Sequence, residues 1–514
     1  MRRLLISAQI IFSMDAVAKD EVKFNTAQST AELNIPAQLK GLVIDPHRLE
    51  TAYSMMITLQ VHRGLFRYSP DGNVLEDAVE SWEKNKSNTK FLFKLKKISF
   101  SDGTPLKATH VKNSFARIFL LGGAASMGAD MAYIEGSSEL QENLNLDKFG
   151  VNAIDDHTVE FSLSRPSILF IKHLAAVDCG ILAISNKAEL LESTKNLKNF
   201  PGIGPFKVSK QTPSEIVLEK WKSDPLDSKN PPQRIRFFEP TQDPVVMAKA
   251  KLNDVLDHES IDDESKALLL SQGWFETATE LSNEIFVVLN PKKVARTIRE
   301  YVFNQLDVEK VLKEIDSKML KPAYGLIPNG IPGFISKIER NSESKLFDTQ
   351  NKSIPKGSFE LEYADNSTLM KKIAFAIKKQ LDRDTFKVNL KACNPITCKQ
   401  RFFAKEAQAS LRSRGLDYFE GYSVLAYLRS SSNNYYSISN PEIDNLLDKA
   451  VTQFDEKERM ATYRTIQFKA LQEMTIVPIF FGSSAAGLWS AKTSFVPNHP
   501  GGIHTLPLET VTMR

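Results

Sequence analysis

The sequence is poor in cysteine and has no long apolar run. Cys179, Cys393 and Cys398 are the only cysteines among 514 residues. No segment after the N-terminal region approaches the ~20 uninterrupted apolar residues of a membrane-spanning helix. The net charge is only +4, and no lysine–arginine run or aromatic–basic repeat is present. We therefore expect neither an integral membrane protein nor a nucleic-acid-binding groove.

The common catalytic signatures are also missing. The sequence contains no H-E-x-x-H, G-x-S-x-G or G-x-x-x-x-G-K-[ST] motif. "GIGPFK" at residues 202–207 has no third glycine, so it does not predict a dinucleotide-binding loop. S-x-x-K occurs at Ser87–Lys90 and Ser342–Lys345, in polar stretches that favour solvated loops. We expect no enzyme, no metal and no cofactor, and acyl transfer by S-x-x-K remains a rival function.

The N-terminus has the order of a secretory signal peptide. Two arginines precede an apolar run, and "AVA" follows at residues 16–18. This order predicts a signal peptide over residues 1–18 with cleavage after Ala18. A first strand or an ordinary helix start is the structural alternative. Because no cysteine lies before Cys179, we expect a soluble, exported, periplasmic product without a lipid anchor.

Cys393 and Cys398 enclose the short segment "NPIT". Export permits a disulfide between them, and two free thiols are an equal alternative. A zinc site is disfavoured because no histidine lies near the pair, and two thiolates alone are a poor zinc shell.

The remaining composition and patterning are those of a soluble α/β protein. Apolar residues make up 42% and charged residues 25%, and the length predicts two or three domains. "FLFKLKK" and "TVEFSLS" alternate as half-buried strands do, and "EIFVVLNP" predicts a strand buried on both faces. Helical spacing appears over residues 295–312, and Asn440-Pro441 predicts a capped helix start.

Six segments with recognisable motifs follow one another along nearly the whole chain. They are "GLVIDPHRLETAYSMMITLQVHRGLFRYSPDGNVLEDAVESW", "FLFKLKKISFSDGTPLKATHVKNSFAR", "FPGIGPFKV", "IREYVFNQLDVEKVL", "NNYYSISNPEIDNLLDKA" and "ERMATYRTIQFKALQEMTIVPIFF". Together they resemble the bacterial extracellular solute-binding proteins of family 5, which serve oligopeptide, dipeptide and nickel ABC importers. The likeness is most specific in "FSDGTP" at residues 100–105. Asp102-Gly103 predicts a tight turn there, which we expect to be structural and not to touch ligand.

The resemblance implies an α/β periplasmic-binding-protein fold, type II and cluster C-like, with two lobes and an extra inserted subdomain. The first lobe would combine residues 19–65, 186–276 and 476–514. The inserted subdomain would span residues 66–185, and the second lobe residues 277–475. A ligand would be enclosed when the two lobes close about a hinge.

A transport function follows from the same resemblance. The protein would capture peptides, or a similar small zwitterion, and deliver them to an ABC importer. The permease and ATPase would be separate chains, and the binding protein a monomer. Within the family a nickel chelate or another solute is the alternative ligand. A non-transport receptor or adaptor is an alternative of another class.

The candidate ligand site is the stretch "RSRGLDYFEGYSVL" at residues 412–425, where charges and rings are interleaved without a helical period. In peptide-binding members, a segment similar to "DYFEGYSVL" carries an aspartate that pairs with the α-amino group of the ligand. The resemblance places Asp417 at this position, with Tyr418, Phe419 and Tyr422 around it. A carboxylate shielded by aromatic rings gains more from a cation than it would in water.

Two arginines precede this aspartate. Arg412 or Arg414 could bind a ligand carboxylate through two parallel hydrogen bonds. The plain alternative is an ion pair between Asp417 and Arg414 on the surface, worth under about 1 kcal/mol. Glu420, three residues after Asp417, is expected to matter less.

Overall fold

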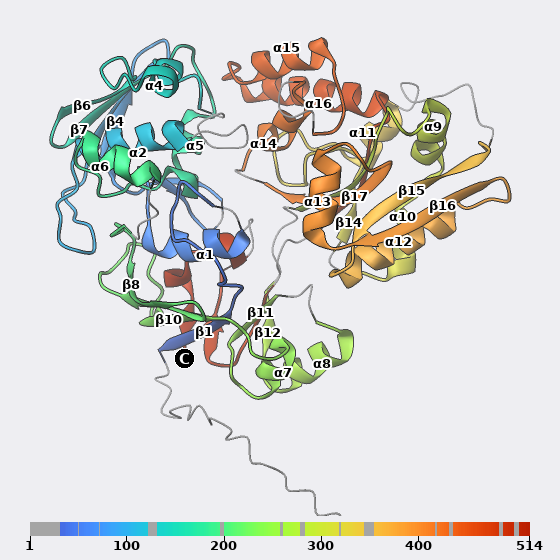
Figure 1. The fold of residues 1–514 in the computed structure, drawn as a ribbon, viewed down its shortest axis with the longest axis horizontal. Helices are drawn as coiled ribbons and strands as arrows, with labels where there is room; N and C mark the ends of the chain where they lie inside the picture. Colours follow the sequence, from blue (N-terminus) through green and yellow to red (C-terminus); the bar gives the residue numbers. More distant parts are fainter. Residues whose placement is uncertain are drawn as a thin grey trace, which may run out of the picture.

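The computed structural model describes residues 31–49, 51–70, 72–121, 131–195, 200–257, 261–277, 283–317, 320–343, 354–416, 419–430, 435–482, 487–497 and 503–514. The expected signal peptide lies outside them. We call residues 31–277 with 487–514 the first body, and residues 283–482 the second body; they stand side by side in Figure 1. Among the described residues, no helix is long and apolar enough to span a membrane.

The base of the first body is built from segments far apart in the sequence. Strand β1 (Glu32–Pro36) pairs in parallel with β10 (Arg234–Phe238), and β9 (Glu215–Lys220) and β8 (Phe206–Thr212) complete the sheet β1-β10-β9-β8. A second sheet has the order β11 (Val255–Asp257), β19 (Gly487–Trp489), β12 (Phe275–Glu276). Leu33, Ile235 and Trp489 share one core there with α1 (Ala52–Val61). Helices α7 (Pro244–Lys249) and α8 (Asp263–Ser271) pack beside it.

The upper part of the first body is an antiparallel sheet with its own core. Its order is β4 (Val79–Lys84), β5 (Lys90–Leu95), β7 (Thr158–Ser162), β6 (Val151–Asp155). Phe91, Phe93 and Leu95 are buried on one face, which confirms the predicted alternation. The hairpin β2 (Phe66–Tyr68)–β3 (Val74–Glu76) and helices α2 (Ala108–Leu121), α4 (Ser137–Asn143), α5 (Phe170–Leu174) and α6 (Lys187–Lys195) surround it.

The second body has a six-stranded mixed sheet between two helical layers. The order is β14 (Leu320–Pro322), β18 (Ile476–Gly482), β13 (Asn283–Leu289), β17 (Ala409–Gly415), β15 (Gly357–Ala364), β16 (Phe386–Cys393). Helices α9 (Arg296–Gln305), α10 (Val308–Ile315) and α12 (Thr368–Leu381) cover one face. Helices α14 (Gly421–Leu425), α15 (Pro441–Ala450) and α16 (Glu456–Gln472) cover the other. Central strand β13 is therefore buried on both faces, as predicted.

The chain crosses between the two bodies twice. One crossing joins Thr277 to Asn283, and the other joins Gly482 to Gly487. The expected lobe boundary at Thr475 lies before the second crossing. Because β18 pairs with β13 and β14, the six-stranded sheet extends to Gly482.

The "FSDGTP" segment forms the predicted tight turn. Gly103 has a φ of 91°, and the Asp102 Oδ1 atom accepts a hydrogen bond from the Thr104 amide at 2.9 Å. The Ser101 amide donates to the Gly202 carbonyl at 2.9 Å, so this turn rests on the "GIGPF" segment. A Cβ at Gly202 would lie 1.9 Å from the Val61 carbonyl oxygen, so only glycine fits against the end of α1. Both motifs thus shape the first body.

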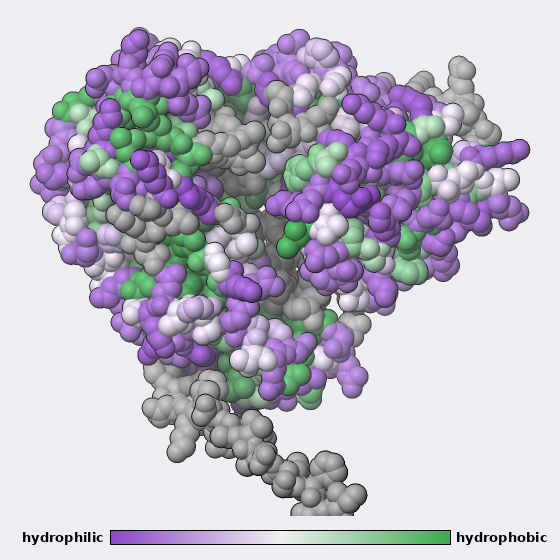
Figure 2. Space-filling model, viewed as in Figure 1, coloured by the Kyte–Doolittle hydropathy of each residue, from purple (hydrophilic) through white to green (hydrophobic). Residues whose placement is uncertain are grey.

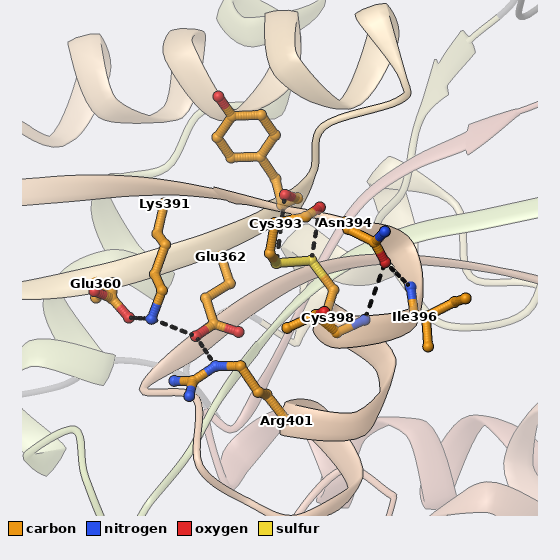
Figure 3. The surroundings of a disulfide bond; sticks show 10 residues. Glu360, Glu362, Lys391, Cys393, Asn394, Ile396, Cys398 and Arg401 are labelled. Atoms are coloured by element: carbon orange, nitrogen blue, oxygen red, sulfur yellow. Dashed lines mark hydrogen bonds and ion pairs between the residues drawn. A yellow bond between two sulfur atoms is a disulfide. The ribbon is translucent and has the colours of Figure 1, made fainter.

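Of the two alternatives for the cysteine pair, the structure has the disulfide. Cys393 at the end of β16 is bonded to Cys398 in α13 (Pro395–Phe403), with the Cα atoms 5.6 Å apart. Figure 3 shows the bond beside Glu362, whose carboxylate pairs with Arg401 Nε at 2.8 Å. The bond therefore fixes the first turn of α13 to the sheet.

The S-x-x-K serines lie at the surface, as expected. Ser87 is exposed in the turn after β4, where its hydroxyl hydrogen-bonds the Thr89 hydroxyl at 2.9 Å. Ser342 ends α11 (Lys337–Ser342) and donates to the Glu339 carbonyl at 2.8 Å. Lys345 lies outside the described residues.

Candidate functional site

The predicted ligand-binding stretch connects the end of β17 to α14, which faces α5 of the first body in Figure 1. Figure 2 shows the surface hollowed between the two bodies. Asp417 and Tyr418 fall outside the described residues, so their ligand role stays a prediction. The remaining predicted residues, Arg412, Arg414, Phe419 and Tyr422, are all placed.

Arg414 is held by the strand next to it. The register of β13 and β17 sets Arg414 opposite Glu284, and its Nη2 atom lies 3.2 Å from Glu284 Oε2. The same nitrogen donates to the Val424 carbonyl at 3.3 Å. The two side chains are only 10% and 2% exposed. Arg414 thus has a partner within the protein, and a ligand carboxylate would have to compete with Glu284.

Three tyrosines enclose this pair. The Arg414 guanidinium lies 4.2 Å from the ring centroid of Tyr427 in η4 (Ala426–Leu428), 5.4 Å from Tyr436 and 5.9 Å from Tyr435. Cation–π contacts of this kind are strongest when desolvated. Burial raises the pKa of Glu284 to about 7, although the Arg414 charge lowers it. The carboxyl group of Glu284 is therefore poised to titrate near neutral pH.

Arg412 lies on the same face of β17 but in different surroundings. Its guanidinium is 5.0 Å from the ring centroid of Phe402, and Lys405 Nζ is 5.2 Å from the same centroid. Arg412 forms no ion pair with any described acid, and its side chain is half-buried. Of the two arginines, Arg412 is the one whose charge is not already neutralised by a described carboxylate.

Phe419 lies at the contact between the two bodies. Its ring meets the Tyr68 ring of β2 edge to face, with centroids 5.0 Å apart. Its carbonyl accepts a hydrogen bond from Lys172 Nζ of α5 at 3.3 Å. The Tyr68 hydroxyl in turn donates to the Lys172 carbonyl at 3.1 Å. Phe419 is therefore a contact between the two bodies.

Glu420 forms a contact between the two bodies that the sequence did not indicate. Its side chain is fully buried, and its carboxylate forms an ion pair with Lys172 of the first body. Arg459 Nε of α16 lies 3.6 Å from the other carboxylate oxygen. Burial, and then the nearby Glu420 charge, raise the pKa of the Tyr463 hydroxyl on the same helix. Local sequence gave no sign of these partners.

Tyr422 is buried in α14 within the apolar core of the second body. Its hydroxyl accepts a hydrogen bond from Arg429 Nη2 at 3.3 Å, and Arg429 also pairs with Asp448 at 2.8 Å. The Tyr422 ring therefore helps to seat α14 against α15.

Most of the chain matches one known protein family. The family described as "Bacterial extracellular solute-binding proteins, family 5 Middle" matches residues 73–436. The chain belongs to this family. The match covers most of the chain and confirms the resemblance drawn from the sequence motifs.

Curated relatives align over nearly their full length. The probable D,D-dipeptide-binding periplasmic protein DdpA of Escherichia coli is 24% identical over 477 residues, covering 86% of this chain and 87% of the relative. The periplasmic oligopeptide-binding protein OppA of the same organism is 24% identical over 473 residues, covering 85% and 84%.

A solved structure shares the fold. Haemophilus influenzae OppA in complex with the peptide RPPGFSPFR superposes with a TM-score of 0.74, at 19% identity, covering 94% of this chain and 99% of that one. The periplasmic-binding-protein fold predicted from the sequence is thereby confirmed.

Proposed function

We propose that this protein is a periplasmic solute-binding protein that encloses a peptide, or a similar small zwitterion, between its two bodies for an ABC importer. The observation that carries the proposal is that Arg412 and Arg414 lie near the end of β17, while Phe419 contacts the first body. The names of the curated relatives, which are dipeptide- and oligopeptide-binding proteins, point to the same ligand class.

The two crossings between the bodies would form the hinge. We assign the first lobe to residues 19–65, 186–276 and the C-terminal segment, with residues 66–185 as its inserted subdomain. The second lobe would begin at residue 277 and end at Gly482, where β18 leaves the sheet. Two short connections permit rigid-body closure because few backbone angles need to change.

Each end of the ligand would have its own partner. Asp417 would pair with the ligand ammonium, and Tyr418 and Phe419 would exclude water from the pair. Arg412 would bind the ligand carboxylate, since no described acid pairs with it. Arg414, held by Glu284, would support the end of β17. Main-chain groups of the ligand would contribute as in strand addition, which tolerates many side chains.

The mature protein would act as a monomer, cleaved after Ala18 and without a lipid anchor. The permease and ATPase would be separate chains. Mass spectrometry of the solute that co-purifies with gently isolated protein tests the ligand class. A peptide or another zwitterion is the expected result. A nickel chelate would replace the peptide assignment, and turnover of a β-lactam would overturn the binding-only role.

A further inference from the structure

A lysine of the first body contacts the second body next to the proposed ligand site. Lys172 of α5 contacts two adjacent groups of the second body, the Glu420 carboxylate and the Phe419 carbonyl. Its side chain is 29% exposed, whereas that of Glu420 is fully buried. Lys172 thus keeps access to water within the contact, whereas Glu420 is enclosed there.

Glu420 also has a cationic partner within its own body. Arg459 Nε of α16 lies 3.6 Å from one carboxylate oxygen. Tyr463 of the same helix is near enough for the Glu420 charge to raise its pKa, after burial. They stay with Glu420 if the two bodies separate, because α14 and α16 pack in one core. An isolated buried carboxylate would be prohibitive, but here separation removes only one of its partners. The Lys172–Glu420 pair is thus reversible.

Backbone, apolar and aromatic contacts between the two bodies surround this pair. The Ile168 amide of the first body donates to the Val451 carbonyl of the second at 3.0 Å. Leu169 is buried within the apolar core of the second body. Tyr68 and Phe419, both in contact with Lys172, meet edge to face across the two bodies. An ion pair in such surroundings is less screened than one on the surface.

From these contacts we infer that the Lys172–Glu420 ion pair is a closure contact: it favours the closed arrangement of the two bodies whichever solute is bound. This inference rests on the proposed function, since it requires bodies that open to admit a ligand. Loss of the pair should lower the affinity for every ligand by a similar factor, because it destabilises the closed state and leaves the ligand contacts unchanged.

Spin-label distance measurement on the full mature chain tests the inference without a known ligand. Cysteines replace exposed Glu142 on α4 and Lys457 on α16, which lie on different bodies. The native cysteines should not compete for label, because Cys393 and Cys398 are bonded and Cys179 is buried. The protein is stripped of solute by unfolding and refolding, and its distance distribution gives the open and closed populations.

We expect Lys172→Met and Glu420→Gln each to shift the closed-to-open ratio toward open by about three- to tenfold. The double variant should shift it no further than one change does, as coupling requires. Lys107→Met is the matched control, since Lys107 pairs with Asp156 at 2.9 Å inside the first body and should leave the ratio unchanged. Lys172→Met also guards against misfolding of Glu420→Gln, because it removes only a half-exposed charge.

Two results would overturn the inference. If Lys172→Met matches the control, or if the two shifts simply add, the pair does not govern closure. These failures leave the proposed function intact when the unsubstituted protein shows both populations. If the unsubstituted protein shows one and the same distance with and without its co-purified solute, the result would count against capture between the two bodies.

Discussion

Arg412 and Arg414 have different environments, although a single residue separates them in β17. Arg414 is enclosed by tyrosines and paired with Glu284, whereas Arg412 lies against Phe402 without a described acid. Both are arginines on the same face of one strand, so the local sequence does not distinguish them. The difference comes from β13, which presents Glu284 to one arginine and Phe286 to the other.

Glu284 provides a prediction about pH. Burial raises its pKa to about 7 from an ordinary value of 4.5, so between these values the folded protein holds a proton that the unfolded chain has lost. The free energy of unfolding should therefore fall as pH rises through this window. Glu284→Gln should reduce the difference in melting temperature between about pH 5 and about pH 8.

Glu314→Gln is the control for this measurement. Glu314 is exposed and pairs with Lys379 at 3.0 Å on the surface, so its replacement should leave the pH dependence unchanged. An equal melting-temperature difference in the unsubstituted protein and in Glu284→Gln would mean that other acids set the pH dependence.

Asp417 provides the sharpest prediction about ligand binding. Removing one member of a desolvated charge pair costs about 2–5 kcal/mol, so Asp417→Asn should weaken a free-amine ligand by tens- to thousands-fold. N-acetylation of the ligand should weaken binding to the unsubstituted protein but barely affect Asp417→Asn, because both changes remove the same pair. Calorimetric titration with the co-purified solute and its acetylated form measures both effects.

Asp316→Asn is a suitable control because Asp316 is exposed on the second body and asparagine tolerates its left-handed backbone. It should bind both ligand forms as the unsubstituted protein does. Equal losses on acetylation in the unsubstituted protein and Asp417→Asn would place the amine elsewhere.

At the scale of elements, strand register and glycine contacts decide how the site is built. A slip of one residue between β13 and β17 would turn Arg412 and Arg414 to the opposite face of the sheet. Ala409 and Leu411 of β17 are buried in the core on the opposite face from these arginines, and the slip would remove them from it. Helix α13 is fixed at its first turn by the disulfide, and its later residue Phe402 contacts Arg412.

The two glycine motifs give a prediction at the same scale. Gly202→Ala should destabilise by more than about 2 kcal/mol, because its Cβ would overlap the Val61 carbonyl and force the backbone apart. Gly103→Ala should lower the free energy of unfolding by only about 1–2 kcal/mol. An added Cβ at Gly103 would have no neighbouring atom within 4 Å, so only the positive φ opposes a side chain there. Denaturant unfolding measures both costs.

Ligand affinity should be unchanged in both glycine variants, because both turns lie in the first body, away from residues 412–425. The reverse order of destabilisation would contradict the contact analysis. Unchanged stability with lost binding in Gly103→Ala would instead make that turn a ligand contact.

At the scale of the whole molecule, segments from both ends of the described chain form one body. Glu509 is fully buried near the C-terminus and pairs with Arg63 at the end of α1. Arg67 extends this ionic network to Asp224 at 2.9 Å. Breaking a buried network of this kind leaves charges without partners. The C-terminal segment is thus tied to residues that precede it by more than 400 positions, as the separation of 446 between Arg63 and Glu509 shows.

A prediction about export belongs to the same scale. The charged, apolar and A-x-A order of the N-terminus predicts cleavage after Ala18. N-terminal sequencing of the protein recovered from the periplasm should begin at Lys19. An uncleaved Met1 in the cytosolic fraction would contradict it, and Ala18→Leu should block cleavage, because the peptidase requires a small residue there.

The sequence by itself determined the α/β class, the alternating strand β5, the doubly buried strand β13, the Asp102-Gly103 turn and the family. These features depend on residues close together in the sequence or on an ordered set of motifs, and both can be recognised without the structure. Hydrophobic period and turn chemistry are local properties of the chain.

Only the tertiary structure decided which charges meet. Glu284 and Arg414 are 130 residues apart in the sequence, and Lys172 and Glu420 are 248 apart. The first pair depends on strand register, and the second on how the two bodies pack. Neither leaves a local pattern, because a lone glutamate or lysine in a sequence is most often a solvated surface residue. From the sequence, Glu420 is therefore expected to matter less than Asp417 for ligand binding, although folding buries it fully at the contact between the two bodies.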